Sequence, residues 1–176
     1  MSAPIVFVTG SPSSSSRSSL VAEAVARTVR ARGFTARFFS IRDFDAADVL
    51  LAHAEAPTVA AFLDAVKGAA AVVLSTPVYK ATYAGGLKAL VDLVPPDALV
   101  GKPALGIATT RLPEHGASAT RAFSSLFSFF RARTLDGVVV LDSEFEGAGT
   151  STALGPAAGE RVDGAAGALV AASRPD

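Results

Sequence analysis

The chain has 176 residues, half of them hydrophobic, and its 16 basic residues balance 16 acidic ones. This length suits one domain over residues 1–176, while the even charge and the lack of a basic stripe argue against a nucleic-acid partner. No apolar run reaches the ~18 residues of a membrane helix, so no membrane partner is expected, and the lack of cysteine excludes disulfides and thiol catalysis.

The first predicted element is a strand over residues 4–8, PIVFV, because a continuous apolar run is typical of a parallel strand covered on both faces. The residues around it carry neither a basic segment nor a small-residue cleavage site, and we therefore expect a cytoplasmic protein. An amphipathic helix follows, with apolar residues at helical spacing from Leu20 to Val29 and Gly33 at its end. Between strand and helix lies the serine-rich stretch TGSPSSSSRSS, residues 9–19.

The rest of the chain alternates strands and helices. Strands are expected at 35–41, 70–77, 102–109 and 135–142, and helices around 58–69, at 84–94, along the stripe Phe123, Leu126, Phe127 and Phe130, and in the Ala-rich end. Right-handed crossovers then place helices on both faces. The sequence predicts an α/β fold with a doubly wound, five-stranded parallel sheet in the order 2-1-3-4-5. Residues 144–160 are expected to run over the surface.

The serine stretch is predicted to form a phosphate-binding loop. In a sheet of this order, ligands bind where the strand order reverses, between strands one and three, and the serine loop forms one wall of that crevice. A helix N-terminus, serine hydroxyls and the guanidinium of Arg17 suit a phosphate monoester. The Walker and dinucleotide fingerprints are both missing. The alternative is that Ser18 or Ser19 only caps the helix while the other serines are solvated.

A second loop, within STPVYKATYAGGLKALVDLVP at 75–95, faces the same crevice and holds both tyrosines of the chain. Pro77 stiffens it, Tyr79 or Tyr83 can lie along a ring, and Gly85–Gly86 let the next helix start close by. Together the two loops predict a ligand with a planar ring and a phosphate tail.

These residues resemble the NAD(P)H-dependent FMN reductase family, and in particular the reductases linked to sulfonate-utilising two-component monooxygenases. The similarity lies in TPVYKATYAGGLKALVDLVP, GSPSSSSRSS, DFDAADVLLA, GKPALGIAT and LDGVVVLDS, and it covers about residues 5–145. It implies a flavodoxin-like fold, FMN in the crevice, and a homodimer or homotetramer. The third loop departs from the family pattern, because ATTRLPEH from residue 108 stands where Ala-Thr-Gly-Gly is usual.

The resemblance also implies the residues that bind the cofactor. The phosphate loop would comprise Ser11, Ser16, Arg17, Ser18 and Ser19. The ring-contacting loop would comprise Thr76, Pro77, Val78, Tyr79 and Lys80, and Thr109 and Thr110 would close the other side. No catalytic acid or base and no metal ligand are expected, because the flavin supplies the chemistry.

The implied function is transfer of hydride from NADPH or NADH to N5 of FMN, with reduced FMN supplied to a flavin-dependent monooxygenase that uses a sulfonate. The same loops would also serve a reductase that keeps its FMN and reduces quinones or azo dyes. A flavodoxin-like electron carrier without catalysis is an alternative from another class. The choice of nicotinamide and the size of the oligomer stay open. We expect the helix at 84–94 and Phe129 to lie in a subunit interface, because they add apolar surface outside the core.

Overall fold

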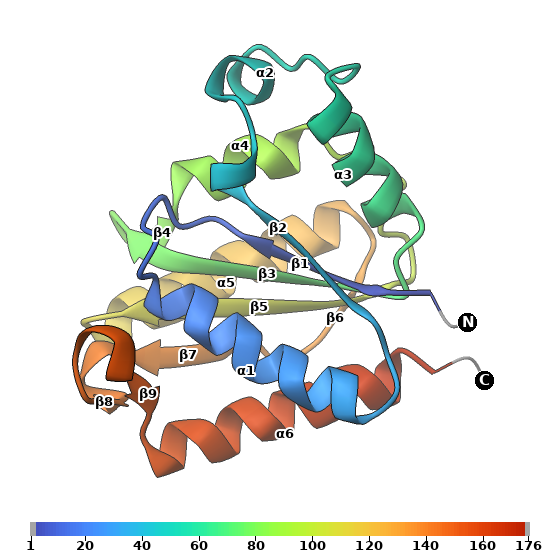
Figure 1. Ribbon diagram of the computed structural model, residues 1–176. Coiled ribbons are helices and arrows are strands. Elements are labelled where there is room, and N and C mark those ends of the chain that lie inside the picture. Colours follow the sequence, from blue (N-terminus) through green and yellow to red (C-terminus); the bar gives the residue numbers. More distant parts are fainter. Residues whose placement is uncertain (1–2, 175–176) are drawn as a thin grey trace.

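The computed structural model describes residues 3–174 and shows a parallel sheet covered by helices on both faces (Figure 1). The parallel strands are β1 (Ile5–Thr9), β2 (Ala36–Ser40), β3 (Ala71–Tyr79), β5 (Pro103–Thr110), β6 (Arg133–Thr134) and β7 (Val138–Leu141). The long helices are α1 (Arg17–Ala31), α3 (Pro57–Lys67), α4 (Gly85–Asp92), α5 (Pro113–Phe129) and α6 (Pro156–Ala172). The order β2-β1-β3-β5-β6 confirms the predicted doubly wound α/β topology.

The apolar runs form the strands at the centre of the sheet because both faces are covered. All five residues of β1 are buried. Ile5 and Phe7 pack in the core beneath α1 and α6, and Val6 and Val8 pack in the core formed with α3, α4 and α5. Helices from both ends of the chain thus hold the strand whose carboxyl end leads into the serine loop.

The fifth position of the sheet differs from the single strand predicted over 135–142. Strand β6 pairs with the start of β5 and β7 pairs with its end, with residues 135–137 between them. A Cβ atom on Gly137 would lie 3.1 Å from the carbonyl oxygen of Gly106, which is closer than most Cβ atoms approach a neighbour. The chain can pass this close to β5 because residue 137 is glycine. The short strand β4 (Thr82–Tyr83) pairs antiparallel with β3, and the main sheet therefore counts seven strands instead of five.

Two connections carry structure that the sequence did not indicate. After β2 come a 3₁₀ turn (Ile41–Asp43) and the short helix α2 (Ala46–Leu50). The segment at 144–160, expected to run over the surface, contains the hairpin of β8 (Phe145–Glu146) and β9 (Ala153–Leu154). The Gly155 N–H donates to the carbonyl of Glu144 at 2.8 Å, and this bond fixes the start of α6 beside the end of β7.

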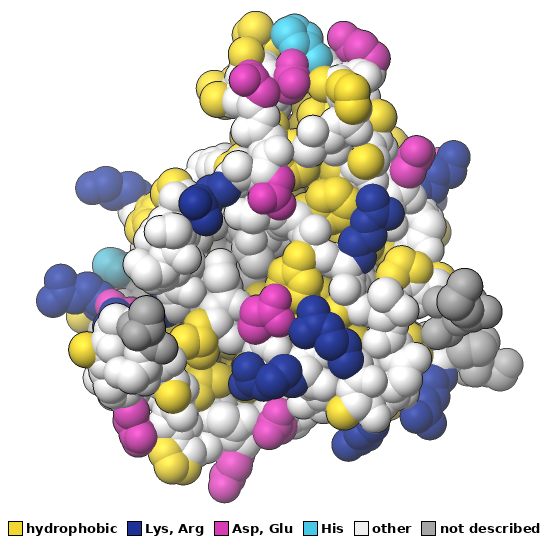
Figure 2. Space-filling view, in the orientation of Figure 1, with side chains coloured by type: hydrophobic (Ala, Val, Ile, Leu, Met, Phe, Trp, Pro, Cys, Tyr) yellow, Lys and Arg dark blue, Asp and Glu magenta, His cyan; other side chains and the backbone are white. Residues whose placement is uncertain are grey.

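The surface of the face that α1 and α6 cover is electrically mixed. Basic and acidic side chains are interspersed there (Figure 2). Within residues 3–174, no helix combines the length and the apolar character needed to cross a membrane.

Candidate functional site

The loops at the carboxyl ends of four strands surround one cavity of about 370 Å³. It lies at the reversal of strand order between β1 and β3, where a ligand site is expected in this topology. Its lining consists of Ser11, Ser13, Ser15, Ser16, Arg17, Pro77, Val78, Tyr79, Thr109, Thr110, Arg111 and Asp142. Both predicted loops therefore meet at one site.

The serine loop is organised by its own hydroxyl groups. The Ser13 N–H donates to Oγ of Ser11 at 3.2 Å, and the Ser15 N–H donates to Oγ of Ser13 at 3.3 Å. The cap of α1 is Ser16, whose Oγ accepts the Ser19 N–H at 3.2 Å. The idea that Ser18 or Ser19 caps the helix is therefore wrong, because α1 begins earlier, at Arg17.

Gly10 brings the start of this loop against α4. Its N–H donates to the carbonyl of Ser75 at 2.8 Å, which carries the pairing of β1 and β3 one residue further. A Cβ atom at Gly10 would lie 2.3 Å from Cβ of Leu87, closer than side chains can pack. Only glycine fits here, and the loop is therefore fixed between β3 and α4.

Two residues predicted for the phosphate loop lie outside the cavity lining. Ser18 is buried, its hydroxyl lies 2.8 Å from Oγ of Ser16, and its carbonyl accepts a hydrogen bond of 2.8 Å from Ser75 Oγ. Ser19 lines a neighbouring cavity of about 500 Å³, which also includes Thr152. Ser18 thus helps to hold the loop in place, and the Ser19 N–H is already bonded to the cap residue Ser16.

Arg17 is the cation of the serine loop, and a carboxylate faces it. Its Nη1 lies 3.1 Å from Oδ1 of Asp142, and its Cζ lies 5.4 Å from the centre of the Phe145 ring. Asp142 follows β7 directly, at the carboxyl end of the fifth strand position. The guanidinium is thus held between a carboxylate and an aromatic face at the edge of the cavity.

The second loop is a tight hairpin. Tyr79 pairs with Thr82, and the two residues between them, Lys80 and Ala81, have φ of +53° and +66°. Pro77, Val78 and Tyr79 line the cavity, with Tyr79 49% exposed at its mouth. Lys80 lies at the turn, outside the lining.

Thr76, also predicted to bind the cofactor, is instead buried beneath this hairpin. Its Oγ1 accepts the N–H of Ala84 at 2.9 Å and donates to the carbonyl of Pro77 at 2.8 Å. The hydroxyl thereby connects the end of β3 to the start of α4.

From the third loop, Thr109 and Thr110 line the cavity, with Arg111 next to them. Oγ1 of Thr110 accepts the Leu112 N–H at 3.3 Å, just before α5 begins at Pro113. Sequence reasoning missed Arg111, Asp142, Ser13 and Ser15 as lining residues. The available signal was the recurrence of serine at positions 11, 13 and 15, because a serine hydroxyl can accept the N–H two residues later and so organise a turn.

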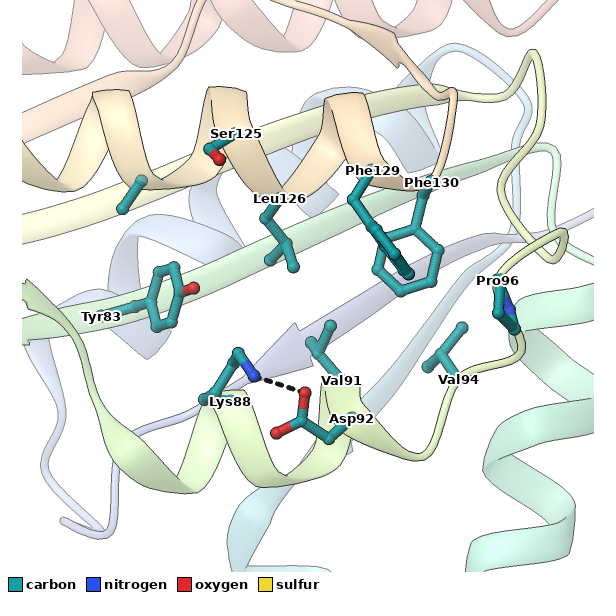
Figure 3. Close-up of a pocket in the computed structure, with 11 residues that line it drawn as sticks. Tyr83, Lys88, Val91, Asp92, Val94, Pro96, Ser125, Leu126, Phe129 and Phe130 are labelled. Carbon is teal, nitrogen blue, oxygen red and sulfur yellow. Dashed lines mark hydrogen bonds and ion pairs between the residues drawn. The ribbon is translucent and has the colours of Figure 1, made fainter.

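A larger cavity of about 580 Å³ lies between α4 and α5 and reaches the second loop at Tyr83. Leu126 and Phe129 of α5, and Phe130 directly after it, face Val91 and the Lys88–Asp92 ion pair of α4 across it (Figure 3). Its lining is mainly apolar, and its polar members are Tyr83, Lys88, Asp92 and Ser125. We call it the α4/α5 groove.

Comparison with known proteins decides the family. The model of the family described as NADPH-dependent FMN reductase matches residues 3–146. The chain belongs to this family. It is 38% identical over 141 residues to the FMN reductase (NADPH) of Pseudomonas putida, covering 80% of this chain and 72% of that protein. The FMN reductase (NADPH) of Escherichia coli is 32% identical over the same length, covering 80% and 74%.

A solved structure agrees with this membership. The apo form of an NADH:FMN oxidoreductase, EMOB, superposes with a TM-score of 0.90 at 26% identity, covering 99% of this chain and 92% of that one. The predicted family, the flavodoxin-like fold and the reaction class, reduction of FMN by NAD(P)H, are confirmed. Within residues 3–174, no group of three His, Asp or Glu side chains is arranged to hold a metal ion.

Proposed function

We propose that this FMN reductase binds FMN in the cavity at the carboxyl edge of the sheet, with the phosphate at the serine loop and the ring between the second and third loops. The observation that carries this assignment is the convergence of Ser11, Ser16 and Arg17 with residues 77–79 and 109–110 around one cavity. Hydroxyls and a guanidinium suit a phosphate dianion. The stiff loop at Pro77 and the threonines opposite it leave a slot that suits a planar ring.

The three loops would hold FMN, and the bound flavin would supply N5 as the acceptor for hydride from the reduced nicotinamide. The chain itself has to hold the two rings in contact and keep water out of the slot. Tyr79, half-exposed at the mouth, is placed to cover the ring side of the cavity, and the hairpin that carries it is fixed to α4 through Thr76. Thr109 and Thr110 approach from β5, a rigid strand at the centre of the sheet. These positions need no acid or base.

A spectrum of the purified protein followed by oxidation of NADPH and NADH, each with and without added FMN, tests the function. Oxidation that depends on added FMN supports the proposal. A yellow flavin that copurifies, together with ping-pong kinetics, indicates instead a reductase that keeps FMN for quinones or azo dyes. No oxidation of either nicotinamide with FMN present indicates a flavodoxin-like carrier.

The destination of reduced FMN is proposed to be a flavin-dependent monooxygenase that acts on a sulfonate. The support is the resemblance of the second loop, residues 75–95, to reductases of that kind. We propose further that residues 1–176 act as one FMN-binding domain and that the protein works in the cytoplasm.

Self-association through the α4/α5 groove is also proposed, with a second copy of this chain as the occupant. Phe129, in the wall of the groove, is 64% exposed, so each copy presents an uncovered aromatic ring within an apolar hollow. Lys88 and Asp92 sit on either side of Leu90 along α4. If two α4 helices meet antiparallel about a two-fold axis, Lys88 of each copy faces Asp92 of the other. The interface then pairs opposite charges twice.

A further inference from the structure

Arg17, the cation assigned to the phosphate, already has an anionic partner. Its guanidinium is 3.1 Å from the Asp142 carboxylate, and the side chains of the two residues are 47% and 34% exposed. Both line the same cavity as the serine hydroxyls. A bound phosphate would therefore share the guanidinium of Arg17 with the carboxylate of Asp142.

The position of Asp142 is held by the residues around it. The neighbouring Glu144 accepts the N–H of Leu141 at 2.8 Å, and the Arg161 guanidinium contacts both of its carboxylate oxygens, at 2.8 and 2.9 Å. These bonds fix the turn at 142–144 to α6. Asp142 thus remains at the cavity when a ligand approaches, whereas Arg17 can swing from its exposed position toward the phosphate.

We propose that Asp142 competes with the flavin phosphate for Arg17 and so limits the affinity for FMN, allowing FMN to enter and leave as a substrate. This inference rests on the proposed function and deepens it. A phosphate monoester carries about −1.5 to −2 charges near neutral pH, and the carboxylate both repels it and neutralises part of the charge that attracts it. Riboflavin has no phosphate, and Asp142 leaves its binding unchanged.

The test is a fluorescence titration of FMN and of riboflavin against the wild type and Asp142→Asn. We expect Asp142→Asn to bind FMN about tenfold more tightly, the factor that one partly exposed charge contact supplies, and riboflavin with unchanged affinity. Asp142→Glu keeps the charge and should keep the weak binding. Asp97→Asn is the matched control, because it changes the net charge equally at the opposite edge of the sheet, before β5 begins.

Measuring Asp142→Asn in the Arg17→Ala variant as well separates competition for Arg17 from direct repulsion between the Asp142 carboxylate and the phosphate. Competition for Arg17 requires that Asp142→Asn gain less FMN affinity in this background than in the wild type. An equal gain in both backgrounds overturns the proposal, since the carboxylate then acts on the phosphate without the arginine. FMN binding that weakens or stays constant in Asp142→Asn also overturns it, because Asp142 then only positions Arg17 or does nothing.

Failure of this inference is distinguishable from failure of the proposed function. Oxidation of NADPH by the wild type in the presence of FMN reports the function whatever the affinity of Asp142→Asn. Riboflavin binding reports an intact ring site in each variant, so a misfolded variant is recognised by its loss of both flavins.

Discussion

The hydroxyl of Thr76 accepts the backbone N–H of Ala84 at 2.9 Å across eight residues, in a fully buried position. This bond closes the hairpin of the second loop at its base and sets where α4 begins. The second loop and the helix that lines the α4/α5 groove thus share one buried contact.

Thr76→Val keeps the shape of the side chain and removes this acceptor. We expect the free energy of unfolding to fall by about 1–3 kcal/mol, because the buried N–H of Ala84 loses its partner. Chemical denaturation measures the change, with Thr58→Val on the exposed side of α3 as the control. Thr76→Ser retains the hydroxyl and should restore most of the stability. Equal effects of the two valine variants would contradict the assigned role.

Arg17→Ala should weaken the binding of FMN far more than the binding of riboflavin. A charge-assisted contact contributes about 1.5–3 kcal/mol, which corresponds to a loss of about 10-fold to 150-fold in FMN affinity, and the Asp142 partner places the expected loss near the lower end. Riboflavin binding should stay nearly constant. Arg27→Ala, an exposed arginine on the same helix, is the control. Equal losses for both flavins would show that the loop acts through folding alone.

The hairpin turn at Lys80 and Ala81 carries two left-handed residues in a row, a backbone that Asn-Gly adopts more readily. Replacing the pair by Asn-Gly should raise the free energy of unfolding by about 1 kcal/mol, since a side chain such as that of Ala81 is strained at positive φ. The midpoint of chemical denaturation measures this. A lower midpoint in the Asn-Gly variant would show that Lys80 stabilises the turn by a contact of its own.

The Glu144 carboxylate predicts how the stability of the protein depends on pH. Burial raises the pKa of its carboxyl, but the Leu141 N–H and the Arg161 guanidinium outweigh burial and hold the pKa below its ordinary value of 4.5. A lowered pKa in the folded state contributes stability above the ordinary value, and this stability is lost as pH falls through the folded pKa. Glu144→Gln should therefore be less stable than the wild type at neutral pH, and the difference should vanish in acid.

Denaturation curves of both proteins between neutral pH and the acid limit of folding measure this difference. The exposed Glu55→Gln serves as control. A difference between wild type and Glu144→Gln that is independent of pH would rule out the charge as its source.

Phe129→Lys should prevent self-association, because it places a charge on the exposed apolar wall of the α4/α5 groove. Light scattering at micromolar concentration is expected to show an oligomer for the wild type and a monomer for the variant. Leu50→Lys replaces another exposed apolar side chain, on α2, and should leave the mass unchanged. A monomeric wild type would contradict the proposed interface.

The fold followed from the sequence because its signals are local. The apolar runs of β1, β3 and β5 and the helical spacing between them each lie within a few residues, and the topology rules then leave few arrangements. The start of α1 was misjudged because several consecutive serines can each cap a helix, and only the backbone shows that Ser16 does so.

The site was predictable where one loop forms it and hidden where distant segments meet. Asp142 lies 125 positions after Arg17, and no spacing rule links them. The break at Gly137 and the turn at Lys80 and Ala81 were equally hidden, because the first depends on a contact with Gly106 and the second lacks the glycine that usually indicates such a turn.

The broken fifth strand has a consequence for how the molecule behaves at high concentration. An exposed sheet edge with a long row of free N–H and C=O groups invites another chain to pair with it and starts aggregation. Here one edge is divided into β6, with two residues, and β7, with four. At the other edge, β2 has only five residues and carries an exposed arginine, Arg37, whose guanidinium lies over the Phe39 ring. Both edges thus carry features with which natural sheets limit such pairing: short, interrupted strands at one edge and a charged side chain at the other.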